Sequence, residues 1–217
     1  MICAIILASG HSSRFNNQTL KQFHQLNGRI MLDYPVQTFS ECSEIDKIII
    51  VVPKEKLTTI QAKYPYHKVV AGGSSRRESS YNGLKACSPE TEKVLIHDAA
   101  RALVDNATIL RCLNELKNTE AVSTVMPTKD TVVEANKNII LSMPNRDLMF
   151  LEQTPQGFHI QTLLDAHRKI TAETTDDIRL VKEMGIECKT VEGSENNFKI
   201  TTPKDFQFAE MLLKESI

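Results

Sequence analysis

Short apolar runs alternate with segments of helical periodicity through the first half of the chain. Apolar runs with the length of strands buried in a parallel sheet lie at residues 3–7, 47–52, 69–71, 94–97 and 121–126. Segments with apolar residues at helical spacing, or with helix-start signals, lie at residues 30–39, 53–63, 75–86 and 106–116. Strands that alternate with helices through short links predict an α/β fold with a doubly wound, mostly parallel sheet.

The pattern changes after residue 127. Residues 130–134 and 139–143 are β-prone and flank a polar turn, which predicts a hairpin. An isolated hairpin is marginally stable in water, so we expect a projecting β-arm at about residues 127–152 that packs on a second subunit. An edge hairpin lying on its own sheet is the alternative. Further helices are predicted at residues 160–169, 176–184 and 203–214, and the whole chain, 1–217, is expected to form a single domain.

The first apolar run ends in a loop suited to an anion. Residues 8–10 are Ala-Ser-Gly, three small residues that allow a ligand to approach the backbone closely. Arg14 follows four residues after Gly10, and Lys21 follows seven residues after Arg14. A buried strand that ends in exposed N–H groups and two cations suits a polyanion, most simply a nucleoside triphosphate.

Polar residues also follow other predicted strands. Gly72 and Gly73 follow residues 69–71, and Asp98 follows residues 94–97. Because open parallel sheets bind ligands at the carboxyl ends of their strands, these residues are expected to meet the first loop at one edge.

Composition restricts the classes of partner. The 26 Lys and Arg residues nearly balance 27 Asp and Glu residues, so the net charge is −1 and no global field attracts nucleic acid or an anionic membrane. Any cationic site must therefore be local. The five cysteines are widely spaced without a Cys-x-x-Cys motif, which favours reduced thiols in a cytoplasmic protein. No apolar stretch approaches the roughly 20 residues of a membrane span.

The opening loop matches neither a Walker A motif nor Gly-x-Gly-x-x-Gly. It resembles the Leu-Ala-x-Gly-x-x-x-Arg loop of nucleotidyltransferases that activate sugars. Other blocks follow it in order: Lys21-Gln22-Phe23, Gly72-Gly73 with Arg76 and Ser79, residues 97–101, Asp130-Thr131, Arg146, residues 153–156, residues 175–177 and residues 199–201. Together they resemble the 2-C-methyl-D-erythritol 4-phosphate cytidylyltransferase family and its close relative, ribitol-5-phosphate cytidylyltransferase, over practically the whole chain.

The resemblance implies a homodimeric enzyme with a Rossmann-like domain and a β-arm that helps to complete the neighbour's active site. It implies transfer of CMP from CTP to a polyol phosphate with Mg²⁺, releasing pyrophosphate. Residues 99–101, Ala-Ala-Arg, favour methylerythritol phosphate as the acceptor, whereas residues 145–147, Asn-Arg-Asp, are closer to the ribitol enzyme. A nucleotide-binding module without catalysis is a third hypothesis, and such a module should tolerate loss of Lys21 or Lys199.

Matching positions imply roles for individual residues. The catalytic group comprises Arg14, Lys21, Lys199 and Asp98, with Asp98 also a candidate magnesium ligand alongside the phosphates. The nucleotide-binding group comprises Ala8, Ser9, Gly10, Gly73, Arg76, Ser79, Ala99 and Arg101. The acceptor-binding group comprises Thr131, Arg146, Thr154 and Thr175. Ser74 departs from the acidic residue usual in the family after the two glycines.

The reaction explains why cations dominate this set. The acceptor phosphate is already anionic near neutral pH, because its second pKa is about 6. It therefore needs no general base, and the obstacle is repulsion between the acceptor and the triphosphate. Fixed positive charge and positioning should supply most of the catalysis.

Overall fold

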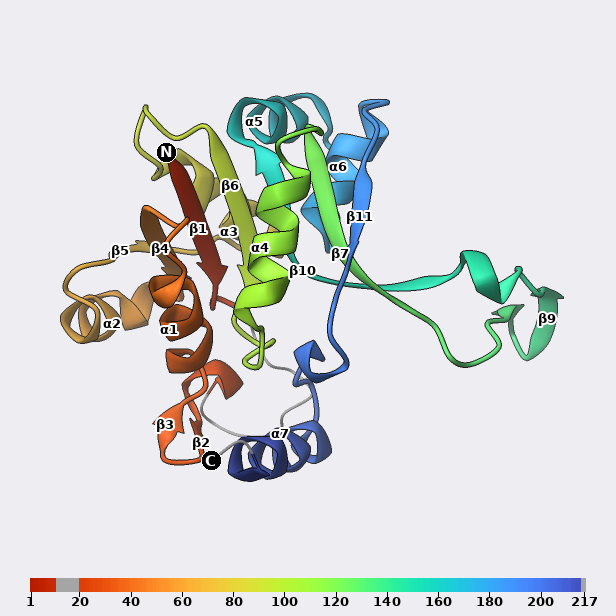
Figure 1. The fold of residues 1–217 in the computed structure, drawn as a ribbon, viewed down its shortest axis with the longest axis horizontal. Coiled ribbons are helices and arrows are strands. Elements are labelled where there is room, and N and C mark those ends of the chain that lie inside the picture. The colour runs from red at the N-terminus through yellow and green to blue at the C-terminus, as the bar shows by residue number, and fades with distance from the viewer. Residues whose placement is uncertain (11–19, 216–217) are drawn as a thin grey trace.

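The computed structural model describes residues 1–10 and 20–215, and within these ranges seven strands form one sheet (Figure 1). The strand order is β11-β7-β10-β6-β1-β4-β5. The strands are β1 (Ile2–Leu7), β4 (Lys47–Val52), β5 (Lys68–Ala71), β6 (Lys93–Asp98), β7 (Ala121–Pro127), β10 (Phe150–His159) and β11 (Lys189–Glu192). All pair in parallel except β10, which runs antiparallel to both of its neighbours. The predicted α/β fold with a mostly parallel sheet is confirmed.

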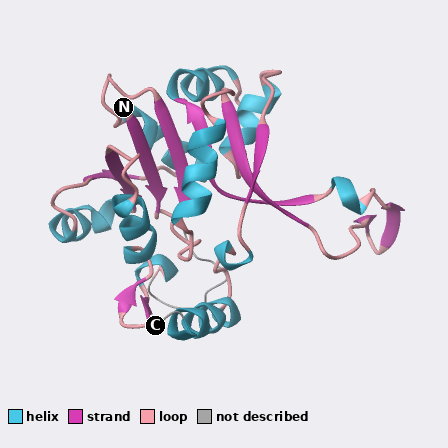
Figure 2. Ribbon diagram, in the orientation of Figure 1, coloured by secondary structure: helices cyan, strands magenta, loops and turns pink. Residues whose placement is uncertain are grey.

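Helices cover both faces of the sheet (Figure 2). Side chains alternate along each strand, so Ala4 and Ile6 of β1 face one layer while Cys3 and Ile5 face the other. The first layer contains α1 (Asp33–Glu41), η2 (Lys54–Lys56), α2 (Leu57–Lys63) and α4 (Asn106–Glu115), and the second contains α3 (Arg76–Lys85), α5 (Ile160–Lys169) and α6 (Asp177–Glu183). Burial on both faces explains why the strands are continuous apolar runs.

The predicted helix at residues 30–39 begins too early. Residues Arg29–Ile30 form β3, which pairs with β2 (Gln25–Leu26). The turn between these strands is Asn27-Gly28, and both residues have positive φ, 48° and 81°. Asn-Gly is the sequence that such a tight hairpin turn favours, and it takes residue 30 into a strand before α1 begins.

The hydrophobic pattern does not predict β10, although this strand lies between β6 and β7. Its centre, residues 153–156, is polar and contains Pro155. The pairing with β7 shifts register between Glu152 and Gln156, and proline is tolerated at such an irregularity because no ladder hydrogen bond is lost. At this irregularity the polar side chains Gln153, Thr154 and Gln156 are buried, and Thr154 accepts a hydrogen bond from the end of β6.

A small lobe lies beyond the carboxyl edge of the sheet. It contains η1 (Lys21–Phe23), β2, β3, η4 (Glu195–Asn197) and α7 (Pro203–Glu215). Its core includes Met31 after β3, Ala209 of α7, and Ile200 between η4 and α7. Lys21 lies in η1, and Lys199 directly precedes Ile200 of this cluster. The lobe therefore holds both cations near the carboxyl edge of the sheet.

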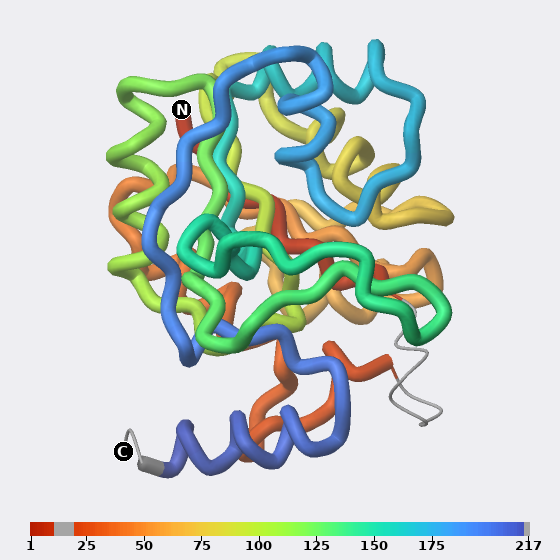
Figure 3. The backbone as a smooth tube through the Cα atoms, turned by 90° about the vertical axis from the view of Figure 1, so that its right-hand side faces the viewer, coloured from red at the N-terminus to blue at the C-terminus, as the bar shows by residue number. Residues whose placement is uncertain are grey.

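The chain leaves the sheet after β7 and returns at the start of β10, and the segment between them projects as an arm (Figure 1). Figure 3 views the molecule from the side on which this arm projects. The arm contains β8 (Glu134–Asn136), β9 (Ile139–Ser142) and η3 (Arg146–Leu148). The expected hairpin is present but shorter than predicted, because residues 130–133 do not pair.

All five cysteines are free thiols, as expected from their spacing. No helix in the described part of the chain is long and apolar enough to cross a bilayer.

Candidate active site

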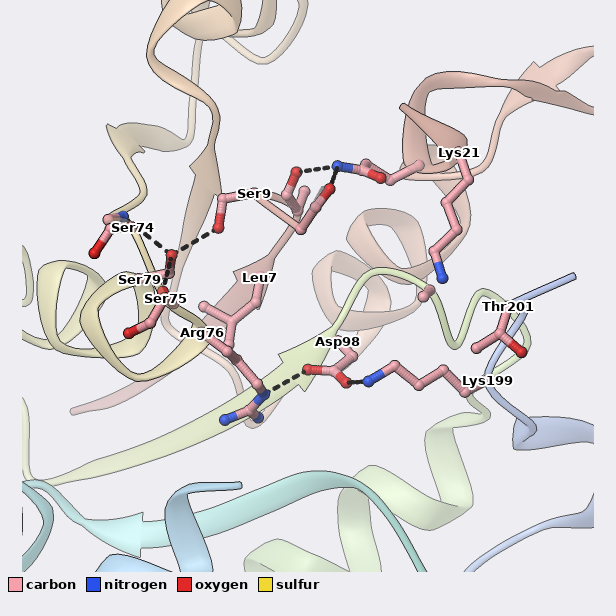
Figure 4. Close-up of a pocket in the computed structure, with 15 residues that line it drawn as sticks. Leu7, Ser9, Lys21, Ser74, Ser75, Arg76, Ser79, Asp98, Lys199 and Thr201 are labelled. Carbon is pink, nitrogen blue, oxygen red and sulfur yellow. Dashed lines mark hydrogen bonds and ion pairs between the residues drawn. The ribbon is translucent and has the colours of Figure 1, made fainter. Parts of the chain in front are cut away.

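A cavity of about 280 Å³ lies where the ends of β1, β5 and β6 meet the small lobe. Figure 4 shows the side chains that converge on it. The predicted site residues that line it are Ala8, Ser9, Gly10, Lys21, Gly73, Arg76, Ser79, Asp98 and Lys199. The residues that line it but were not singled out as site residues are Leu7, Gln22, Ser74, Ser75, Ala100 and Thr201. Three separate strand ends thus contribute to one cavity, as the sequence predicted.

Gln22 holds the loop that follows β1. Its side-chain amide donates to the backbone oxygen of Ala8 at 2.6 Å and to that of Gly10 at 3.1 Å. Gln22 is almost fully buried, so these bonds are shielded from water. Sequence reasoning missed this role, although Gln22 lies in the Lys-Gln-Phe block that carried part of the resemblance.

A second network joins the loop after β1 to the start of α3. The Ser9 hydroxyl donates to Ser79 Oγ at 2.8 Å, and Ser79 Oγ also accepts the Gly73 N–H at 3.0 Å. A Cβ on Gly72 would lie 2.4 Å from the Cβ of Ser9. Position 72 therefore requires glycine, because any side chain there would keep the loop after β5 away from the loop after β1.

Asp98 lies at the floor of the cavity between two cations. Lys199 Nζ is 2.6 Å from Asp98 Oδ2, and Arg76 Nε is 3.2 Å from Asp98 Oδ1. Burial alone would raise the pKa of Asp98, but Arg76 and Lys199 outweigh it and hold this pKa well below its usual range. The carboxylate is therefore ionised at neutral pH.

Positive charge exceeds negative charge in the cavity. Lys21, Arg76 and Lys199 are its described cationic lining residues, against one carboxylate, that of Asp98. Lys21 Nζ donates to the backbone oxygen of Ile200 at 2.6 Å, which directs it toward the segment that carries Lys199. A concave site with a net positive charge concentrates and orients a polyanion.

A buried hydrogen-bond chain supports Asp98 from behind. The Asp98 N–H donates to Thr154 Oγ1 at 3.1 Å, and Thr154 Oγ1 lies 3.0 Å from Nδ1 of His97. His97 Nε2 lies 3.1 Å from the backbone oxygen of Arg101. Because a carbonyl oxygen only accepts, Nε2 carries the proton and Nδ1 accepts from the Thr154 hydroxyl. Burial lowers the pKa of His97 to about 4, so the ring is neutral at pH 7.

Three predicted ligand contacts do not line the cavity of the described chain. Thr154 is buried in the chain just described, and Ala99 is buried in the core. The Arg101 guanidinium donates to the backbone oxygens of Asn197 at 2.9 Å and Glu152 at 2.8 Å. Arg101 therefore links β10 to η4, which ends two residues before Lys199.

The remaining predicted residues lie away from the cavity or outside the described residues. Thr131 and Arg146 are exposed on the arm, where Arg146 Nη1 donates to the backbone oxygen of Lys129 at 3.4 Å. Thr175 is exposed before α6, and its hydroxyl donates to Asp176 Oδ2 at 2.7 Å. Arg14 lies outside the described residues. The described chain thus brings six of the eight predicted nucleotide-binding residues to the cavity, and none of the four predicted acceptor-binding residues lines it.

The described residues contain no group of three or more His, Cys, Asp or Glu side chains that could hold a metal ion. Asp98 is the carboxylate of the cavity, and both of its oxygens contact cations. Mg²⁺ keeps most of its ligands as water and substrate phosphate and takes only one or two protein carboxylates, so an ion held mainly by phosphates would not need a larger acidic cluster.

Comparisons with known proteins agree with this geometry. The profile of the IspD family, 2-C-methyl-D-erythritol 4-phosphate cytidylyltransferase, matches residues 2–215. A protein of that name from Clostridium botulinum (strain Langeland / NCTC 10281 / Type F) is 38% identical over 224 residues, covering 97% of this chain and 96% of the relative. Another of that name, from Caldanaerobacter subterraneus subsp. tengcongensis, is 36% identical and covers 99% of both chains.

Solved structures show the same fold. The crystal structure of 4-diphosphocytidyl-2C-methyl-D-erythritol synthase from Anaerococcus prevotii has a TM-score of 0.88 at 31% identity, covering 98% of this chain and 96% of that one. The crystal structure of 2-C-methyl-D-erythritol 4-phosphate cytidylyltransferase from Thermus thermophilus has a TM-score of 0.82 at 28% identity, covering 97% and 98%. Because the matches extend along practically the whole sequence, the chain belongs to the 2-C-methyl-D-erythritol 4-phosphate cytidylyltransferase family of CTP-dependent nucleotidyltransferases.

Proposed function

We propose that this chain transfers CMP from CTP to 2-C-methyl-D-erythritol 4-phosphate and releases pyrophosphate. The observation that carries the proposal is the cationic cavity at the carboxyl edge of the sheet, where Lys21 and Lys199 meet Asp98. The names of the relatives favour methylerythritol phosphate over ribitol 5-phosphate as the acceptor.

The triphosphate binds along the loop after β1. Ala8, Ser9 and Gly10 present their backbone to it, and Gln22 keeps that loop in one conformation through its two carbonyl contacts. The base lies toward Gly73. The network of Ser9, Ser79 and Gly73 supports this assignment because it holds the loop that carries Gly73 against the loop after β1.

The acceptor phosphate attacks the α-phosphorus of CTP, and pyrophosphate leaves. Lys21 and Lys199 stabilise the negative charge that develops on the equatorial and leaving oxygens. Arg14 is assigned to the same role from its place in the motif. Asp98 holds Lys199 in place, and it is the carboxylate of the cavity that would lie beside a Mg²⁺ ion held mainly by the triphosphate. When bound, the metal supplies charge neutralisation and orients the phosphates.

The acceptor side of the site comes from a second subunit. Thr131 and Arg146 lie on the arm and do not line the cavity of their own chain. An arm that reaches a neighbouring subunit would place the planar guanidinium of Arg146 beside an acceptor phosphate there. A guanidinium can bind a phosphate through two parallel hydrogen bonds. We therefore propose a homodimer in which each arm completes the other subunit's site. The five free cysteines support a reducing, cytoplasmic location.

An acceptor panel tests the function directly. The purified protein is incubated with CTP and Mg²⁺ together with methylerythritol phosphate, ribitol 5-phosphate or no acceptor, and pyrophosphate release is measured. We expect turnover with methylerythritol phosphate and at least about 100-fold lower kcat/KM with ribitol 5-phosphate, because the dimer site must reject the longer polyol. Faster turnover with ribitol 5-phosphate would reverse the acceptor assignment, and no turnover with either would remove the proposed activity.

A further inference from the structure

A line of alternating charges runs from the cavity into the helical layer behind it. At the cavity, Lys199 lies 2.6 Å from one oxygen of Asp98, and Arg76 lies 3.2 Å from the other. Behind the cavity, Arg76 Nη1 lies 2.7 Å from Asp177 Oδ2, and Asp177 Oδ1 lies 3.0 Å from His167 Nε2. Asp177 and His167 do not line the cavity, so neither has a direct place in the reaction described above.

Asp177 is built into the fold as a buried anion. It is the first residue of α6, its exposed fraction is 0%, and its N–H donates to Gln156 Oε1 at 3.1 Å. Burial alone would raise the pKa of Asp177, but Arg76 and then His167 outweigh it and lower this pKa. His167 is itself stacked on Tyr81, with ring centroids 5.3 Å apart. A fully buried carboxylate is costly unless its partners are fixed, and here they are fixed on both sides.

The contact between Arg76 and Asp98 is not the one that these two groups favour by themselves. A guanidinium and a carboxylate commonly pair through two parallel N–H···O bonds, which would engage both oxygens. Here Arg76 reaches Asp98 through Nε alone, while Nη1 is directed to Asp177. Nη2 is buried without a hydrogen-bond partner among the described residues. Asp177 therefore competes with Asp98 for the guanidinium.

We propose that Asp177 is a positioning residue that restricts Arg76 to one oxygen of Asp98 and so leaves the other oxygen to Lys199. Without the Asp177 charge, Arg76 rotates to bind both oxygens of Asp98, and Lys199 loses the contact that holds it over the cavity. His167 steadies Asp177 from the opposite side. The kinetic consequence rests on the proposed function, because it assumes that Lys199 acts on the reacting phosphates.

A double-mutant cycle between Asp177→Asn and Arg76→Lys tests the proposal. In the enzyme with Arg76, D177N should lower kcat about tenfold and change the KM for CTP less than about threefold, because Lys199 acts on the transition state. In the R76K enzyme, D177N should change kcat less than about twofold, since a lysine cannot donate two parallel hydrogen bonds to the Asp98 carboxylate. An equal effect of D177N in both backgrounds would overturn the proposal, because a general loss of packing does not depend on residue 76.

Asp176→Asn is the matched control. It removes the same charge one residue away, at the N-cap position of α6, where the Asp176 side chain makes no capping hydrogen bond. We expect its kcat to stay within about twofold of the wild-type value. A loss in D176N as large as that in D177N would mean that net charge, and not the contact with Arg76, sets the rate.

Two further measurements keep the proposal testable if a variant fails to fold or the wild type shows no turnover. If D177N does not fold, His167→Leu should lower kcat about threefold, and His167→Gln, which keeps a donor toward Asp177, should restore it; equal rates would contradict the proposal. If the wild type is inactive with every acceptor, the proposed function fails, and a crystal structure of D177N still decides the positioning role. Both Asp98 oxygens on Arg76, with Lys199 displaced, would support it, and an unchanged Arg76 would not.

Discussion

The cavity at the sheet edge and the projecting arm obtain their order from different sources. Around the cavity, Asp98 and Thr154 are buried, and both have hydrogen-bond partners within the same chain. Along β9 of the arm, Ile139 and Leu141 are 66% and 59% exposed. The cavity is held in place by the core of its own chain, whereas an exposed apolar strand needs a second surface to cover it.

The exposed strand indicates where a second subunit should contribute. Ile139 and Leu141 of β9, and Met143 directly after it, are exposed apolar residues, and these three residues define the apolar face of the arm. The exposed Arg146 lies farther along the same arm. If the apolar face packs on a partner, Arg146 is carried to that partner together with it.

Charging the apolar face should produce the largest effect. In the Ile139→Asp/Leu141→Asp variant we expect the dimer dissociation constant to rise about 1,000-fold, roughly 4 kcal/mol, because two apolar side chains lose their burial at the interface. Sedimentation equilibrium measures this constant. Tyr66→Asp, at a position 95% exposed outside the arm, is the matched control and should leave the dimer intact. A dimer of unchanged affinity in the double variant would show that the arm is not the interface.

Removing a cation from the cavity should come next. Lys199→Ala should lower kcat about 100-fold, or roughly 2.7 kcal/mol, the scale of one lost group that stabilises transition-state charge. Lys204→Ala removes the same charge from an exposed position on α7 and should change kcat less than about twofold. Pyrophosphate release under saturating substrates gives both values. The mechanism could not stand if the two variants were equally active.

The smallest effect concerns the buried support of Asp98. The pKa of His97 is lowered to about 4 in the folded protein, from an ordinary value of 6.5, so the unfolded chain binds more protons between these values. This contribution to stability is present above about pH 6.5 and is lost as the pH falls toward 4. Between pH 7 and pH 5 we expect the free energy of unfolding to decrease by about 2 kcal/mol through His97.

Urea unfolding at several pH values checks this contribution. The His97→Gln variant has no group that titrates at this position, so its stability should depend less on pH over the same interval. Parallel pH profiles for the two proteins would mean that His97 is not held neutral by the fold. The arm has no comparable buried histidine among its described residues, so charging it should leave the pH profile unchanged.

Much of the architecture followed from local pattern. Continuous apolar runs such as residues 47–52 predict buried parallel strands, because strands covered on both faces cannot alternate with polar residues. The small residues after β1 and the cations near them predicted an anion site, and the cavity contains Ser9, Gly10, Lys21 and Lys199. The strand β10 escaped prediction because polar side chains and Pro155 at a register shift replace the usual apolar run.

Local sequence patterns were thus enough to predict the fold class, the position of the arm hairpin and the chemical character of the cavity. Which polar residues face the cavity and which pack behind it depends on the folded chain. Thr154 and Arg101 belong to the motifs, yet they bind backbone and buried groups, while Asp177 acts on Arg76 across 101 positions of the chain. Motif spacing records which residues are present, but the direction of a side chain depends on packing between elements that are distant in sequence.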